Sequence, residues 1–124
     1  MGAEKYNQAM KNGAYQAAEE IITNLLLDLD SSSITVTELA LIYNDRGLAR
    51  YNQVKFWQAI EDYDFALSIC SSEAAIHYNR STILYRMGNF SKAMAGFKTA
   101  VQLKPDNQDF TDGLNACKQA LMIL

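Results

Sequence analysis

The chain has 124 residues, of which 49% are hydrophobic and 20% are charged, and its net charge is −3. This length suits one domain, and 11 basic and 14 acidic residues without a basic stripe disfavour nucleic acid as a partner. The longest apolar runs fall far short of the ~20 residues that span a bilayer. The start of the chain has no secretion signal, so we expect a cytoplasmic protein that does not bind membranes.

The first third of the sequence predicts one helix pair, repeat 1, at about 1–32. The predicted segments, in order, are a helix over about 3–11, a turn at Asn12-Gly13, a helix over about 14–29 and an insertion over about 33–39. The polar run at residues 30–33 marks the place where the insertion begins.

Residues 40–107 carry one pattern written twice, with a period of 34 residues. Small and aromatic residues recur in register, and the matched pairs are Ala40 and Ala74, Arg46 and Arg80, Tyr51 and Tyr85, Phe56 and Phe90, Ala59 and Ala93, Tyr63 and Phe97, and Ala66 and Ala100. Apolar residues stand three or four positions apart, which predicts amphipathic helices. Gly47 and its counterpart Ser81 let two helix backbones approach closely. We therefore expect repeat 2 at 40–73 and repeat 3 at 74–107, each burying its apolar face by stacking on a neighbour.

Local residue types predict where these helices begin and end. We expect Thr37 to cap the first helix of repeat 2, and Asn52 to take the left-handed conformation in the turn that follows it. Either Ser71 or Ser72 is expected to cap the first helix of repeat 3. The second helix of repeat 3 stops before Pro105, which has no amide hydrogen and disfavours helix at the preceding residue.

Residues 108–124 predict an amphipathic helix that covers the last repeat. Phe110, Leu114 and Cys117 recur at steps of four and three residues, as an apolar helix face does. The end of this helix, residues 121–124, is apolar on all sides. One interpretation is a partly docked terminus, and the other is a patch for self-association or a truncation point.

A period of 34 residues, with small and aromatic residues in this register, resembles the tetratricopeptide repeat (TPR) family. The resemblance is carried by residues 40–107 and extends, in degenerate form, to the first repeat. It implies an all-α fold, a right-handed superhelix of three helix-turn-helix repeats with a C-terminal capping helix. It also implies a non-catalytic adaptor whose partner is another protein or peptide, because the family shares a scaffold and not one partner.

In such a superhelix the first helix of each pair lines a concave groove. Residues expected to face this groove recur at helical spacing, and they are Asn7, Lys11, Asn44, Leu48, Tyr51, Asn52, Tyr78, Thr82, Tyr85 and Arg86. Their amides can bond the backbone of an extended peptide, and their rings can pack on its side chains. The alternative is that Tyr51 and Tyr85 only pack against the neighbouring helix.

TPR proteins that bind the acidic C-terminal tails of chaperones carry lysines, asparagines and an arginine at five positions of the groove. In this chain those positions are Ala3, Asn7, Asp45, Ala75 and Asn79. Both lysines and the arginine are missing, and Asp45 would repel a tail carboxylate. We therefore expect no binding of chaperone tails.

Charged residues within the repeats predict structural roles. Arg46 and Arg80 take a position that is usually apolar in the family. We expect an ion pair between adjacent helices, with Asp62 or Glu61 as the acidic partner. Arg50 is expected to turn its charge outward to solvent while its stem packs on the helices.

Nothing in the sequence predicts an enzyme. His77 is the only histidine and is expected to pack, and together with the distant Cys70 and Cys117 it makes no metal site. The pair Glu19-Glu20 is expected to be solvated, since adjacent helical residues point in different directions. We expect no catalytic residue, no metal and no cofactor, and we expect both cysteines to be reduced.

Overall fold

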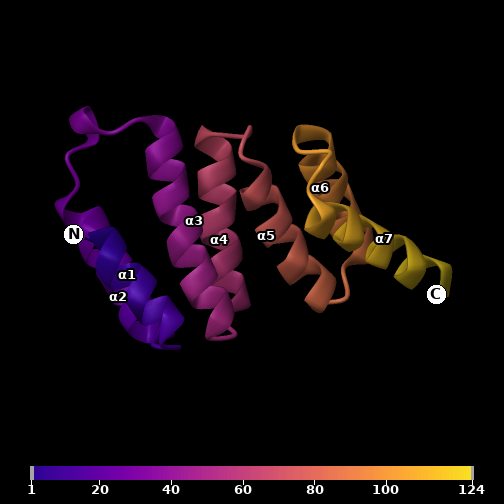
Figure 1. The fold of residues 1–124 in the computed structure, drawn as a ribbon, viewed down its shortest axis with the longest axis horizontal. Helices are drawn as coiled ribbons and strands as arrows, with labels where there is room; N and C mark the ends of the chain where they lie inside the picture. Colours follow the sequence, from indigo (N-terminus) through magenta and orange to yellow (C-terminus); the bar gives the residue numbers. More distant parts are fainter. Residues whose placement is uncertain (1, 124) are drawn as a thin grey trace. The chain divides into compact units, whose positions relative to one another are not determined.

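The computed structural model describes residues 2–123, and every regular element in that range is helical (Figure 1). The elements are α1 (Gly2–Lys11), α2 (Tyr15–Asp28), the short 3₁₀ helix η1 (Ser31–Ser33), α3 (Val36–Asn52), α4 (Phe56–Ile69), α5 (Ala74–Arg86), α6 (Phe90–Leu103) and α7 (Gln108–Ile123). The all-α class and the order of the predicted helices are confirmed. No helix among residues 2–123 is long and apolar enough to cross a membrane.

The helices form two compact units, residues 1–69 and residues 70–124. In the first unit α1 packs on α2, α2 on α3, and α3 on α4. The core between α1, α2 and α3 is built from buried residues of all three helices, which are Tyr6, Ala9, Ala18, Ile22 and Ala49. Three of these five are alanines, so the helices lie close together and Tyr6 and Ile22 fill the space that remains.

The close approach of α3 and α4 depends on a glycine, as the repeat pattern predicts. A Cβ atom placed on Gly47 would lie 2.6 Å from Cε1 of Tyr63, whose side chain is fully buried. Any larger residue at position 47 would therefore push the ring or the helix away. The tyrosine fills the volume that the missing side chain leaves.

The second unit uses the same principle twice. Between α6 and α7, a Cβ atom on Gly113 would lie 2.6 Å from Cε1 of Phe97. Between α5 and α6, a Cβ atom on Gly96 would clash with the hydroxyl of Ser81, which is buried. Helix α7 packs on α6 and also contacts α5, with Phe110 and Cys117 buried, so the prediction of an amphipathic C-terminal helix is confirmed. The prediction for residues 121–124 can be compared with the structure only up to Ile123, because Leu124 lies outside the described residues.

The first helix of each pair ends in the same turn, at repeat-equivalent positions. After α1 and α5 the left-handed residue is a glycine, Gly13 (φ 73°) or Gly88 (φ 81°). After α3 it is Val54, with φ 62°, and not Asn52, which still belongs to the helix. The Val54 amide donates to the carbonyl of Tyr51 and the next amide donates to the carbonyl of Arg50. This pair of backbone hydrogen bonds is the Schellman motif, in which the residue after the C-cap adopts a positive φ.

Two predicted helix caps are wrong by one or two residues. Helix α3 is capped by Thr35, whose hydroxyl accepts from the amide of Glu38 while the Glu38 carboxylate accepts from the Thr35 amide, both at 3.1 Å. This reciprocal capping box satisfies two free amides, which Thr37 in the first turn cannot do. The residue before α5 is Glu73, which makes no side-chain cap, in place of the predicted Ser71 or Ser72.

Candidate functional site

The predicted binding residues of the first unit lie on α1 and α3. We call this set the α1–α3 surface and define it by Asn7, Lys11, Asn44, Leu48, Tyr51 and Asn52. Asn7 and Lys11 are exposed on α1, whereas Asn44 is only 9% exposed on α3. The hydroxyl of Tyr6 donates to the backbone carbonyl of Asp45 at 2.8 Å and joins the two helices beside these residues.

The C-terminal end of the α1–α3 surface combines a half-buried ring with an exposed amide. Tyr51 stacks on Phe56 of α4, with ring centroids 5.7 Å apart. Its neighbour Asn52 is exposed, and its side-chain amide donates to the carbonyl of Leu48 at 2.9 Å. Tyr51 therefore does pack against the neighbouring helix, as the alternative interpretation predicts, but part of its ring remains exposed to solvent.

The remaining predicted residues belong to α5 in the second unit. Tyr85 repeats the arrangement of Tyr51, with its ring 5.2 Å from that of Phe90. Tyr78 is held more firmly, because its ring lies 5.6 Å from Phe97 of α6 and 5.0 Å from Phe110 of α7. Thr82 turns its hydroxyl back to the Tyr78 carbonyl at 2.9 Å, and Arg86 is exposed. Of these four residues of α5, Arg86 is therefore the most exposed to solvent, and Tyr85 keeps part of its ring exposed.

A network of charged side chains ties α2, α3 and α4 together. Asp62 of α4, 3% exposed, accepts hydrogen bonds from Nη2 of Arg46 at 2.8 Å and from Nε of Arg46 at 3.0 and 3.3 Å. Arg50 donates to the same carboxylate at 3.0 Å. The predicted pair of Arg46 with Asp62 is confirmed. The expectation that Arg50 points to solvent is wrong, because its guanidinium lies between two carboxylates.

The second of these carboxylates is Glu19 of α2, and the prediction that it is solvated is wrong, because its side chain is only 16% exposed. Glu19 accepts from Arg50, Lys55 and Gln53, each at 2.9 Å. Burial alone would raise the pKa of Glu19, but the hydrogen bonds from Lys55, Arg50 and Gln53 outweigh it and lower the pKa to about 2. A signal was present in the sequence, since repeat 2 has basic residues where repeat 3 has Leu84 and Asn89. Those additional cations require an acidic partner outside their own repeat.

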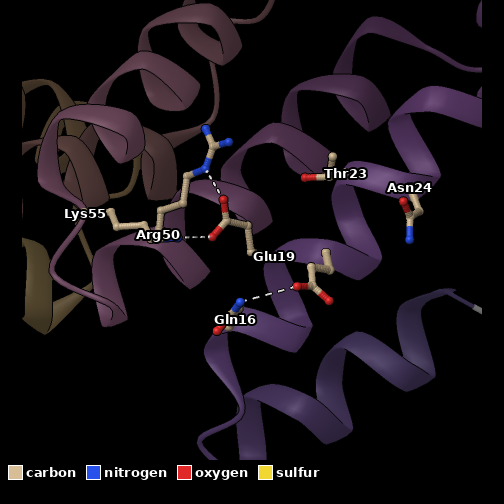
Figure 2. Close-up of a pocket in the computed structure, with 7 residues that line it drawn as sticks. Gln16, Glu19, Thr23, Asn24, Arg50 and Lys55 are labelled. Carbon is tan, nitrogen blue, oxygen red and sulfur yellow. Dashed lines mark hydrogen bonds and ion pairs between the residues drawn. The ribbon is translucent and has the colours of Figure 1, made fainter.

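Three of the charged residues, Glu19, Arg50 and Lys55, line an open hollow of about 520 Å³ on the first unit (Figure 2). Figure 2 shows Arg50 and Lys55 both reaching the Glu19 carboxylate. The other lining residues are polar residues of α2, namely Gln16, Glu20, Thr23 and Asn24. Both cations that line the hollow, Arg50 and Lys55, already have a carboxylate partner, so neither is left to attract an anionic ligand. The charged residues of the hollow therefore hold the helices together.

The single histidine, His77, forms a hydrogen bond with the loop before α5. Nε2 of His77 lies 2.8 Å from the carbonyl oxygen of Ser71 and holds the segment that leads into α5. Among the described residues, no group of three or more histidine, cysteine, aspartate or glutamate side chains could hold a metal ion. Both cysteines are free, and burial raises the pKa of the Cys117 thiol.

Comparison with known sequences supports the repeat pattern. Residues 74–107, which are repeat 3 as predicted, match the tetratricopeptide repeat family. A curated relative is the serine/threonine-protein phosphatase T of Trypanosoma brucei brucei, which is 26% identical over 98 residues. The match covers 79% of this chain but only 21% of the phosphatase, so the chain spans about a fifth of that protein's length.

Solved structures share the fold of the whole chain. The first TPR domain of Spaghetti (RPAP3), bound to the HSP90 peptide SRMEEVD, has a TM-score of 0.82 at 22% identity and covers 96% of this chain and 89% of its own. The TPR domain of Arabidopsis OM64 has a TM-score of 0.81 at 23% identity and covers 94% and 90%. The myosin chaperone UNC-45 of C. elegans, in complex with an Hsp90 peptide, has a TM-score of 0.84 at 24% identity and covers 94% and 13%. At these identities the likeness shows a TPR fold.

Proposed function

We propose that the chain is a non-catalytic adaptor that binds an extended segment of another protein on the first helices of its repeats. The observation that carries the proposal is the α1–α3 surface, where an open part of the Tyr51 ring lies beside the exposed amide of Asn52. Rings supply contact area at low entropic cost, and amides bond the backbone of a bound strand. Solved TPR domains of the same fold hold peptides of HSP90 and HSP70, which supports a peptide partner for this chain.

We also propose that the partner is not the acidic tail of a chaperone. The positions that would supply its cations are Ala3, Ala75 and Asn79, none of which is basic. Asp45 adds a negative charge where a tail carboxylate would lie. The partner is a protein or peptide rather than nucleic acid or membrane, and we expect it to be met in the cytoplasm.

The order of features supports a finer similarity within the family. A degenerate first repeat, a polar insertion and two repeats that open with Tyr43–Gly47 and Tyr78–Ser81 are similar to the small animal tetratricopeptide repeat protein 32. This similarity implies no activity.

Affinity capture from cell extract tests the adaptor proposal. We expect the double variant Tyr51→Ala/Arg86→Glu to lose the partner while its helical circular dichroism stays unchanged. A control, Tyr15→Ala/Lys98→Glu, makes a matching tyrosine truncation and a comparable charge reversal on α2 and α6 and should retain the partner. Capture at the wild-type level by the first variant would overturn the proposal, and the bound proteins are identified by mass spectrometry.

A second candidate function is self-association through the end of α7. Met122 and Ile123 are 84% and 85% exposed, which is unusual for adjacent large apolar residues. This alternative predicts a dimer or larger species that becomes monomeric when residues 122–124 are deleted. Analytical ultracentrifugation over a range of concentrations decides it, and a monomer throughout would exclude it.

A further inference from the structure

Asp45 is a half-buried carboxylate whose charge is not balanced within the described part of the chain. It lies on α3 next to Asn44 and one turn before Leu48, and so borders the α1–α3 surface. The hydrogen bond from Tyr6 goes to its backbone carbonyl and leaves the carboxylate unbound. Burial raises the pKa of Asp45 to about 6, and no positive charge among residues 2–123 is a cause that lowers it.

The other inward-facing carboxylates of the first unit are treated differently. Asp62 receives two arginines, and Glu19 receives an arginine, a lysine and an amide. Because Arg46 and Arg50 are committed to these two acids, neither makes an ion pair with Asp45. Lys11, the cation of the α1–α3 surface, makes no ion pair with it either among residues 2–123. An acid that loses hydration without gaining a partner is stabilised when a cation arrives from outside.

We infer that Asp45 binds a lysine or arginine side chain of the partner segment, so that this adaptor selects basic peptides where the chaperone-binding domains select acidic ones. The inference rests on the proposed function and adds the chemical class of the partner. Leu48, one turn farther along α3 and half-buried, offers an apolar surface for the methylene stem of that side chain. The exposed amide of Asn7 on α1 can bond the peptide backbone nearby.

Peptide libraries provide the test. The full chain is incubated with acetylated and amidated octapeptide libraries in which one position is fixed as lysine, arginine or glutamate and the others are random. We expect the chain to retain the lysine or arginine libraries at one position at least. A single peptide made from the selected residues is then titrated by fluorescence polarisation. We expect Asp45→Asn to weaken its binding roughly tenfold or more, as the loss of a charge-assisted bond does.

Two further variants separate binding from folding. Asp45→Glu keeps the charge and should retain most of the affinity, while Asp28→Asn removes an exposed carboxylate at the end of α2 and should change nothing. Selection of a basic peptide that Asp45→Asn binds as well as the wild type overturns the inference and leaves the adaptor proposal standing. Selection of the glutamate library has the same meaning. If no library is retained, both the inference and the adaptor proposal fail.

Discussion

The turn after α3 holds a β-branched residue in a conformation that suits glycine, so Val54→Gly should stabilise the protein. A left-handed φ costs an L-residue about 1–2 kcal/mol, and glycine avoids that cost. The greater freedom of glycine in the unfolded chain offsets about 0.5–1 kcal/mol of the gain. Little packing is lost, because Val54 is 72% exposed. The expected net gain is about 0.5–1 kcal/mol in the free energy of unfolding, or a few degrees in Tm.

Urea and thermal unfolding followed by circular dichroism measure this gain, and the chain offers its own controls. Gly88 is the repeat equivalent of Val54, so Gly88→Val should destabilise the protein by a similar amount. Val54→Ala shortens the side chain but keeps the strained φ, and should give no comparable gain. The reasoning is refuted if Val54→Ala stabilises as much as Val54→Gly, since the benefit would then come from removing exposed apolar surface.

Three other predictions follow from the packing and the charges of the first unit. Asp62→Asn should lower the free energy of unfolding in urea by about 3 kcal/mol or more, because two arginines lose their buried partner; a loss below 1 kcal/mol would contradict this. Gly47→Ala should cost about 1–3 kcal/mol, because the added methyl meets the Tyr63 ring, and an unchanged Tm would show that the helices part freely. The folded pKa of Glu19 lies near 2, below its ordinary 4.5, so its stabilisation is present above pH 4.5 and is lost as pH falls toward 2. An acid titration should show this loss in the wild type and a flatter profile in Glu19→Gln.

The helices could be predicted because small and aromatic residues recur at helical spacing along the chain. The pairs Gly47–Tyr63 and Gly113–Phe97 show the physical basis, since each glycine faces a ring that would otherwise clash. Helix ends were harder, because a cap depends on which of several polar residues reaches the free amides. Thr35 and Thr37 are the same residue type, and only the position of Glu38, three residues after Thr35, favours Thr35 as the N-cap.

The charged side chains could be predicted only where both partners belong to one repeat. Arg46 and Asp62 are 16 residues apart on facing helices, and the pattern that predicts the helices also predicts their contact. Arg50 and Glu19 are 31 residues apart, across the insertion, so no periodic rule joins them. The exposed part of Tyr51, and the lack of an ion-pair partner for Asp45 among residues 2–123, likewise depend on burial and on the tertiary contacts, which spacing alone does not give.

The sharing of Glu19 between repeats limits how this protein can be shortened or recombined. Repeat proteins are often treated as cassettes, in which one unit can be removed or exchanged for another. Here Arg50 and Lys55 of the second repeat depend on an acid of the first. A chain that begins at α3 would leave three cations near the single carboxylate of Asp62. A transplanted second repeat therefore needs a glutamate supplied by whatever helix precedes it in its new host.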